Sequence, residues 1–200
     1  MAKLQQTPSQ TVGPYFAYGL LPQQYNYGDG LLKEIASGQV AGADVPGNRI
    51  RIEGQVFDGA GKVITDAMIE IWQADHLGRY AHPRDPRGSN ANFKGFGRFG
   101  TGTEADNKFV FDTIKPGVVE PGAAPHINVI LLMRGMLLHT FTRIYFADET
   151  EANAKDTILA QVPAERRDTL IATRTDTASG MVYRFDIHMQ GPRETVFFDV

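Results

Sequence analysis

The sequence of 200 residues contains no cysteine. That absence excludes a disulfide framework, a cysteine-ligated zinc or iron–sulfur site, and a thiol nucleophile. The formal net charge is only -3, so the sequence indicates no cationic surface for nucleic acid or anionic lipid. No stretch approaches the roughly 18–20 apolar residues of a membrane span, and the first residues lack the basic and apolar regions of a signal peptide. We therefore expect a soluble, cytoplasmic protein in which any metal must be held by His, Tyr or carboxylate side chains.

Short runs of alternating apolar residues fill much of the chain, and its 21 glycines and 11 prolines are dispersed between them. This spacing is typical of β-sandwiches and barrels. Residues 50–56 alternate, a turn follows at Asp58–Gly61, and residues 67–74 form a return run, which together predict a hairpin. Further strands are expected at Phe109–Ile114, His126–Met133, Thr140–Phe146, Met181–His188 and Thr195–Asp199.

Three segments depart from this alternation. Asp148–Leu159 opens with acidic residues and Pro163–Ile171 opens with proline, both of which are typical of helix N-termini. We therefore expect two short helices between strands. Residues 81–100 are rich in glycine and proline and are expected to form a long loop, which on a β scaffold commonly serves function or an interface.

The chain is expected to be one structural domain, because it shows no internal repeat and no linker. Residues 1–49 are extended in pattern, apart from a weak helical signal around Gly30–Ser37. We interpret them as an N-terminal arm that packs against another chain, and residues 50–200 as the β-sandwich.

The five histidines form no compact ligand motif. A period of two in Ala124–Met133 places His126 and Asn128 on the same face of one strand. A metal would take two such same-face ligands from a strand, but only His126 is a competent ligand. Backbone hydrogen bonds at the start of a strand would account for His126 equally well.

Two further side chains could carry chemistry. Tyr80 follows a strand and a turn and could present a phenolate to Fe(III), although a packed tyrosine is the plainer interpretation. Arg134 ends an apolar strand, where its guanidinium could hold a carboxylate through two hydrogen bonds or could simply be exposed. The residues alone therefore indicate a β-sandwich with an incomplete metal site.

Six long segments, in a fixed order, resemble the family of intradiol ring-cleaving dioxygenases. The resemblance runs from about residue 7 to the C-terminus and implies an antiparallel β-sandwich of the intradiol dioxygenase type with two short helices and long loops. The segments are TPSQTVGPYF (7–16), GQVFDGAGKVITDAMIEIWQADHLGRY (54–80), FVFDTIKPG (109–117), APHIN (124–128), RIYFADETEANAKD (143–156) and YRFDIHMQGPRETVFFDV (183–200).

Iron-binding members of this family hold a non-haem Fe(III) with two tyrosines and two histidines. Carried over by position, the first tyrosine falls on Tyr80, the second on Val119, and the histidine pair on His126 and Asn128. Valine cannot coordinate a metal, and a neutral asparagine amide is a poor ligand for Fe(III). The resemblance therefore implies a degenerate iron site and no metal bound by this chain.

In family members built from two kinds of chain, a beta chain holds the Fe(III) and an alpha chain completes the substrate cavity. The resemblance implies that this chain is of the alpha kind, inactive alone, and that Thr11, Gly13, Pro14 and Tyr15 line the cavity of the beta chain. Arg134 would border that cavity, where a substrate carboxylate needs a positive charge. The implied reaction uses O2 to cleave a catechol-type substrate, 3,4-dihydroxybenzoate, to 3-carboxy-cis,cis-muconate.

Two other interpretations stay open. A homomeric intradiol dioxygenase would need His82 or His139 to complete a rearranged iron site with Tyr80 and His126. A prealbumin-like module would use the same sandwich for transport or carbohydrate binding, because topology alone says little about function.

Overall fold

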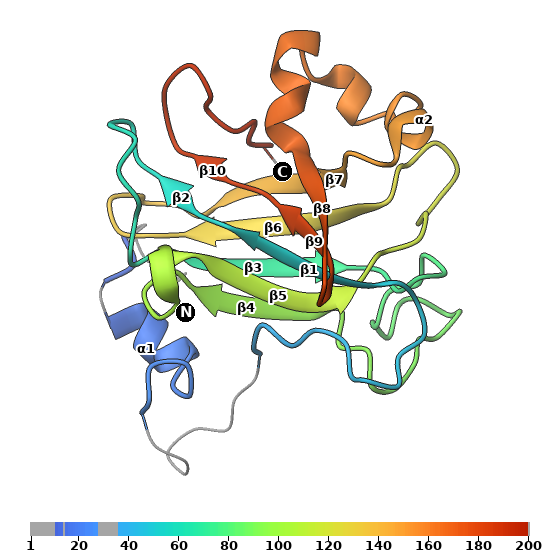
Figure 1. The fold of residues 1–200 in the computed structure, drawn as a ribbon, viewed down its shortest axis with the longest axis horizontal. Helices are drawn as coiled ribbons and strands as arrows, with labels where there is room; N and C mark the ends of the chain where they lie inside the picture. The colour runs from blue at the N-terminus through green and yellow to red at the C-terminus, as the bar shows by residue number, and fades with distance from the viewer. Residues whose placement is uncertain (1–10, 14, 28–35, 200) are drawn as a thin grey trace, which may run out of the picture.

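The computed structural model describes residues 11–13, 15–27 and 36–199. Within these ranges the chain is mainly β, with few and short helices (Figure 1). Part of the expected N-terminal arm, including Pro14 and residues 30–35 of the weak helical signal, lies outside the described residues.

The described strands form one large sheet and one small one. The large sheet has eight strands in the order β4-β3-β6-β7-β8-β9-β1-β5, and the small one pairs β10 with β2. The strands span Arg49–Gly54 (β1), Val56–Phe57 (β2), Met68–Gln73 (β3), Phe96–Gly100 (β4), Phe109–Ile114 (β5), His126–Leu132 (β6), Thr140–Phe146 (β7), Ile171–Thr177 (β8), Gly180–Arg184 (β9) and Ile187–His188 (β10).

The sheet is mixed, which corrects the expected purely antiparallel arrangement. β1 runs parallel to β9, β7 parallel to β8, and β2 parallel to β10. Parallel neighbours need a connection that returns to the starting end of the sheet. Between β7 and β8 this return is made by the helical segments, which lie together at one end of the molecule (Figure 1).

Of the two expected helices, the one over 163–171 is present as a 3-10 helix, and the one over 148–159 is broken into shorter pieces. The helices are α1 (Tyr15–Leu20), α2 (Thr150–Asn153) and the 3-10 helices η1 (Ala105–Asn107), η2 (Leu159–Gln161) and η3 (Ala164–Leu170). The segment expected as one helix over 148–159 is broken because the Asp156 carboxylate accepts hydrogen bonds from the backbone N–H groups of Ile158 and Leu159. No helix in the described ranges is long and apolar enough to cross a membrane.

The expected hairpin between residues 50–56 and 67–74 is wrong. β1 pairs with β5 and β9, whereas β3 pairs with β4 and β6. The turn after Asp58 closes only a local bridge between Phe57 and Val63, because the Asp58 carboxylate accepts hydrogen bonds from the N–H groups at 60 and 62. Alternation identified both strands but not their partners, since most of β3 is buried and takes a neighbour on each side.

Two expected C-terminal strands are also modified. The strand expected over 181–188 is split into β9 and β10, because the Asp186 carboxylate accepts the backbone N–H of Gln55 in place of a ladder hydrogen bond. The segment expected as a strand over 195–199 contributes only a single bridge, between Phe198 and Phe141.

The expected loop over 81–100 is shorter than predicted, because its last five residues form β4. All five pair with β3, and Arg98 of β4 forms an ion pair with Glu70 of β3 at 2.6 Å. The glycine at position 97 marks a close approach rather than a turn, since a Cβ there would lie 2.6 Å from a methyl carbon of Val40. Tertiary pairing therefore overrides the weak strand propensity of glycine.

Residues 37–42 bridge the two edge strands of the large sheet. The N–H of Val40 donates to the carbonyl of Asp112 in β5, and the N–H of Arg98 in β4 donates to the carbonyl of Ser37. Across the same gap, the rings of Phe99 and Phe111 lie 6.0 Å apart. The sheet is thus nearly closed, as in a barrel.

The core fills the interior of this curled sheet. Its largest fully buried side chains include Phe109, Phe111, Phe146 and Tyr183. A second cluster, which includes Tyr145, Leu159, Val162 and Leu170, packs the η2 and η3 segments against β7. The inner faces of β6 and β7 therefore pack in the core, and the candidate site lies on their outer faces.

We predict that Gly38→Ala opens the closure between β4 and β5. A Cβ at Gly38 would lie 2.6 Å from the backbone oxygen of Val110 and 2.8 Å from the Phe99 ring, so the backbone must shift. Overpacking of this kind should lower the free energy of unfolding by about 2 kcal/mol or more, measured by urea denaturation. Gly19→Ala is the matched control, because its Cβ would meet nothing within 4 Å and α1 should gain helix propensity. Equal stabilities of the two variants would contradict the prediction.

Candidate functional site

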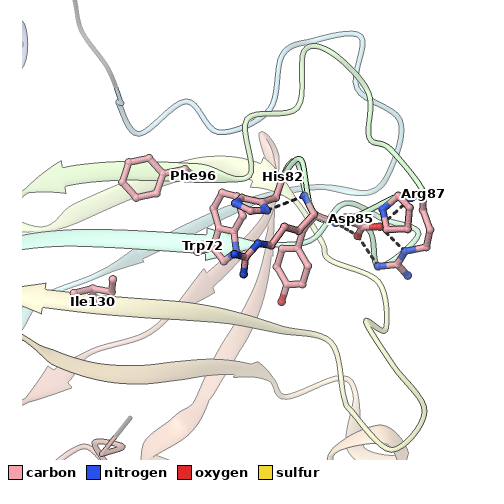
Figure 2. Close-up of a pocket in the computed structure, with 9 residues that line it drawn as sticks. Trp72, His82, Asp85, Arg87, Phe96 and Ile130 are labelled. Atoms are coloured by element: carbon pink, nitrogen blue, oxygen red, sulfur yellow. Dashed lines mark hydrogen bonds and ion pairs between the residues drawn. The ribbon is translucent and has the colours of Figure 1, made fainter.

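Four side chains lie in one row across the outer face of β4, β3, β6 and β7. The strand register pairs Phe96 with Trp72, Trp72 with Asn128, and Asn128 with Arg143. Figure 2 shows Trp72 and Phe96 on neighbouring strands, with Ile130 on β6 beside them. All four residues of the row are half-buried, so the row forms a floor on which the loop after β3 packs.

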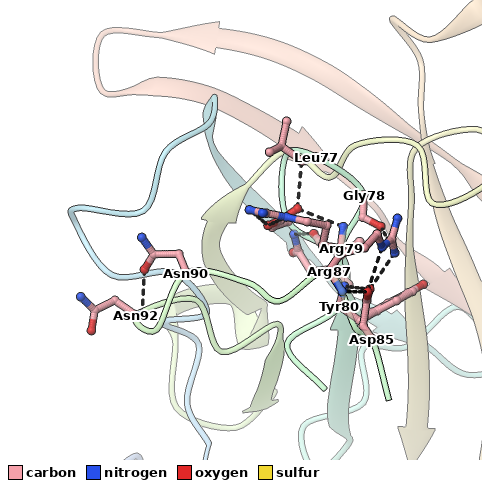
Figure 3. A network of polar contacts seen from close by, with 11 residues as sticks. Leu77, Gly78, Arg79, Tyr80, Asp85, Arg87, Asn90 and Asn92 are labelled. Atoms are coloured by element: carbon pink, nitrogen blue, oxygen red, sulfur yellow. Dashed lines mark hydrogen bonds and ion pairs between the residues drawn. The ribbon is translucent and has the colours of Figure 1, made fainter. Parts of the chain in front are cut away.

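Two aspartates shape the loop after β3. The Asp75 carboxylate accepts the backbone N–H groups of Leu77 and Arg79 and forms an ion pair with the Arg79 guanidinium at 2.7 Å. The Asp85 carboxylate accepts the N–H of Tyr80 at 2.8 Å and pairs with Arg87 at 2.6 Å (Figure 3). Hydrogen bonds from the Arg87 guanidinium and from the Tyr80 N–H hold the pKa of Asp85 well below its usual range.

The loop places two aromatic rings over Trp72. Tyr80 stacks on Trp72 with ring centroids 5.7 Å apart and an interplanar angle of 7°, and His82 meets the same indole edge-on at 6.4 Å. Trp72, Tyr80 and His82 line an apolar cavity of about 750 Å³, with Arg84 and Arg87 among its polar members (Figure 2).

The four positions that the family resemblance assigns to iron ligands come together beside this loop. Tyr80, Val119 and His126 line one cavity of about 310 Å³, and the Asn128 side chain hydrogen-bonds the Tyr80 hydroxyl. The fold therefore gathers residues from the loop after β3, the segment after β5 and the start of β6. Arg143 lines the same cavity.

His126 is held as a neutral side chain. Its Nδ1 donates to the carbonyl oxygen of Ala124 at 2.8 Å, and the residue is only 5% exposed. Burial lowers the pKa of His126 below its usual value, against the hydrogen bond to Ala124, and the positive charge of Arg143 lowers it further. The backbone hydrogen bond expected for a structural histidine is therefore present.

Tyr80 and Tyr145 both stay protonated at neutral pH. Burial raises the pKa of Tyr80, although the Arg143 charge and the Asn128 hydrogen bond act in the opposite direction. Burial also raises the pKa of Tyr145 to about 12, and its hydroxyl donates to the Asp156 carboxylate at 3.0 Å.

These residues do not fit an Fe(III) ion. Of the four family positions, only Tyr80 and His126 carry a ligating side chain, and no group of three His, Cys, Asp or Glu gathers as a metal site among the described residues. Arg143 adds a guanidinium, which is permanently positive and offers donors but no acceptor. A trivalent cation would be repelled by it.

His82 and His139, the alternative iron ligands, lie outside the cavity of Tyr80 and His126. The Nδ1 of His82 accepts the backbone N–H of Arg84 at 3.1 Å, and the ring of His139 packs on Phe141 at 4.8 Å. Neither histidine lines the cavity of Tyr80 and His126. The geometry therefore gives no support to the rearranged homomeric iron site.

The N-terminal residues and Arg134 lie together at a second cavity, near the end of β6. The Thr11 hydroxyl accepts the N–H of Gly135 at 2.9 Å, and Gly13 and Arg134 both line a cavity of about 220 Å³. The Arg134 side chain is 68% exposed, and its Nε forms an ion pair with Asp66 at 2.5 Å. The backbone of Tyr15 begins α1 directly after this segment, while Pro14 lies outside the described residues.

Sequence reasoning missed Arg143 and Asp66. Arg143 stands in the run TFTRIYF of β7, and a lone arginine in a largely apolar strand was a signal that could have marked it. Asp66 carried no such signal, because its pairing with Arg134 joins segments far apart in the sequence.

Comparisons with known proteins identify the family of the chain and agree with its fold. A dioxygenase family profile matches residues 33–191. The protocatechuate 3,4-dioxygenase alpha chain of Burkholderia cepacia is 54% identical over 100% of both chains. The chain belongs to the family of intradiol ring-cleaving dioxygenases. The beta chain of the same enzyme from Burkholderia cepacia is 31% identical, covering 79% of this chain and 71% of that one.

A solved structure shows the same architecture. The dioxygenase domain of a dioxygenase and carbohydrate-binding protein fusion from Streptomyces sp. SirexAA-E superposes with a TM-score of 0.60 at 25% identity, covering 84% of this chain and 96% of that one. The family resemblance and the oxidoreductase class expected from the motifs are thus confirmed. The match identifies a dioxygenase family rather than a prealbumin-like binding module.

We predict that His126 makes stability depend on pH between 7.5 and 5.5. Its pKa in the folded chain lies below the unfolded value of about 6.5, so the unfolded chain binds more protons as the pH falls through that value. The free energy of unfolding should therefore fall from pH 7.5 to 5.5, and His126→Gln should flatten this fall. Urea titrations at both pH values measure it, with the exposed His139→Gln as control. An unchanged pH dependence in His126→Gln would contradict the prediction.

We also predict that Arg143 opposes iron binding even when the missing ligands are restored. The wild-type chain titrated with Fe(III) should give no tyrosinate-to-iron absorption band. The double variant Val119→Tyr/Asn128→His should need at least about tenfold more Fe(III) than the triple variant that also carries Arg143→Gln, because the guanidinium charge is removed. One tightly held iron per wild-type chain, or equal affinities of the two variants, would refute the prediction.

Proposed function

We propose that this chain is the iron-free alpha subunit of an enzyme that cleaves 3,4-dihydroxybenzoate (protocatechuate) with O2, between its two hydroxylated carbons, to 3-carboxy-cis,cis-muconate. The full-length identity to an alpha chain of that enzyme supports the assignment. The observation that carries it is the cavity of Tyr80 and His126. There Val119 and Asn128 stand at ligand positions and Arg143 adds a positive charge.

The proposal requires a partner, because the residues that the structure describes form no site for the iron that the reaction needs. The partner is a beta chain of the same fold, which holds the Fe(III) and joins this chain in a cytoplasmic hetero-oligomer. The similarity of this chain to both the alpha and the beta chain of one enzyme supports such a pairing. In this proposal both chains share the β-sandwich of the family, and this chain is not active alone.

This chain would complete the substrate cavity of the beta chain with the surface near the end of β6, where the N-terminal residues meet Arg134. Thr11 and Gly13 come from the N-terminal arm, with Pro14 and Tyr15 in the same segment, and Arg134 comes from the β6–β7 connection. The hydrogen bond from Gly135 to Thr11 ties the two segments together.

Arg134 is suited to receive the ring carboxylate of the substrate. Its guanidinium is mostly exposed, and its ion pair with Asp66 engages Nε in the described chain. An exposed ion pair of this kind is worth little in water, so it orients the arginine without consuming its remaining donors. Once the partner excludes water, a charge-assisted hydrogen bond to a carboxylate becomes substantially stronger.

We predict that Arg134→Ala weakens the use of protocatechuate by the assembled enzyme. A hydrogen bond to a charged group is worth about 1.5–3 kcal/mol, so kcat/KM should fall roughly 10- to 150-fold. Unsubstituted catechol, which has no carboxylate, should be affected much less. Steady-state kinetics on both substrates, with iron content and complex size checked first, measure the difference.

Arg193→Ala serves as the control for this experiment, because Arg193 is exposed and lines neither the cavity of Arg134 nor that of Tyr80. Its kinetics should match those of the wild type. An equal loss on both substrates in Arg134→Ala would assign Arg134 to assembly and overturn its role toward the carboxylate. Full activity of this chain without a beta chain would overturn the proposed function itself.

A further inference from the structure

One glutamine side chain fixes the segment after α1 to the end of β4. The Gln24 Nε2 donates to the carbonyl oxygen of Gly100 at 2.7 Å, and the Gln24 Oε1 accepts the backbone N–H of the same glycine at 3.0 Å. Nε2 also donates to the hydroxyl of Thr103 at 2.5 Å. Gln24 thus satisfies both backbone groups of Gly100, as a neighbouring strand would. This side chain therefore anchors the N-terminal arm to the sheet.

The next residue, Tyr25, packs against the same strand end. A Cβ at Gly100 would lie 2.6 Å from the Tyr25 hydroxyl oxygen, and a Cβ at Gly102 would lie 3.5 Å from it. A side chain at Gly100 would therefore collide with the ring, and glycine permits the close approach. The contacts of Gln24 and Tyr25 together seat the segment after α1 on residues 100–103.

The same strand end also holds the loop that carries Asp66. Thr101, which directly follows β4, is fully buried, and its hydroxyl accepts the N–H of Ala67 at 3.1 Å and donates to the carbonyl of Ile64 at 2.8 Å. The N–H of Thr101 donates to the carbonyl of Ala67 at 2.9 Å. Both flanks of Asp66 are therefore fixed to the end of β4, and Asp66 in turn pairs with the Nε of Arg134 at 2.5 Å.

The cavity of Arg134 lies between these two anchored segments. Gly13, Phe16 and Tyr25 line it from the N-terminal arm, and Asp66 and Arg134 line it from the loops beside β3 and β6. The carbonyl oxygen of Gly13 accepts the N–H of Phe16 at 3.0 Å, which ties this part of the wall to α1. The width of the cavity therefore depends on how the arm is seated on the end of β4.

We propose that Gln24 is a positioning residue for the substrate carboxylate, because its anchor on β4 holds the arm wall of the cavity against Arg134. The inference rests on the proposed function, which places that carboxylate at Arg134. Without the anchor, only apolar contacts and the hydrogen bond from Gly135 to Thr11 would seat the arm. A shift of about 1 Å in such a wall is enough to misplace a bound group. Binding of a charged ring substituent depends on this fit, whereas ring cleavage at the iron of the partner does not.

Steady-state kinetics of the assembled enzyme carrying Gln24→Ala test the proposal. The KM for protocatechuate should rise about 3- to 10-fold, while kcat and the KM for catechol, which has no carboxylate, should change less than about twofold. Gln24→Glu keeps the length and the acceptor but loses the Nε2 donor, so it should resemble Gln24→Ala. Gln161→Ala is the matched control, because it removes an exposed glutamine amide that donates to the carbonyl of Thr157 at 3.0 Å. Its kinetics should match those of the wild type.

Two further measurements separate positioning from a general loss of stability. In an Arg134→Ala complex, Gln24→Ala should change the KM for protocatechuate by less than about twofold, because no guanidinium is left to be served by the wall. Hydrogen exchange of the Gln24→Ala complex should be faster in residues 11–27 and at the Gly135 amide, which donates to Thr11. Exchange in the core strands should stay as in the wild type.

The outcomes distinguish this inference from the proposed function. An equal rise of KM on both substrates, a full additional effect in the Arg134→Ala complex, or unchanged hydrogen exchange in Gln24→Ala would each overturn the role of Gln24 and leave that of Arg134 intact. An unchanged KM for protocatechuate in Arg134→Ala alone would overturn the proposed role of Arg134, and the role of Gln24 with it, whatever the exchange shows.

Discussion

The register of β4, β3, β6 and β7 is the constraint on which the candidate site depends. It sets Phe96, Trp72, Asn128 and Arg143 in one row across the outer face of the sheet. The register is held by the opposite face, where the inward side chains of these strands are buried in the core. A slip of one residue would turn the whole apolar set to solvent, so core packing fixes the position of Arg143.

The cavity of Tyr80 and His126 combines few metal-ligating side chains with an arginine. Two of the four family positions cannot ligate iron, and the neighbouring β7 strand places a guanidinium against the remaining Tyr80 and His126. The positive charge and the burial together hold His126 neutral.

The N-terminal part of the chain contributes twice. Residues 37–42 join β5 to β4 and bring the curled sheet near closure. Farther toward the N-terminus, Thr11 is anchored to the connection that carries Arg134. The closure of the sheet and the cavity of Arg134 therefore both depend on segments that pair over long sequence distances.

The sequence by itself determined the mainly β class, most of the strand positions, the family, and the positions of Tyr80 and His126, because alternation and long motifs are local properties of the chain. Only the tertiary structure decided that β1 pairs with β5 and β9, that a glycine-rich segment becomes β4, and that Arg143 lies beside Tyr80. A period of two shows which face a residue occupies but not which distant strand lies next to it. That choice depends on the closing of long loops and the packing of the whole core, which no local pattern contains.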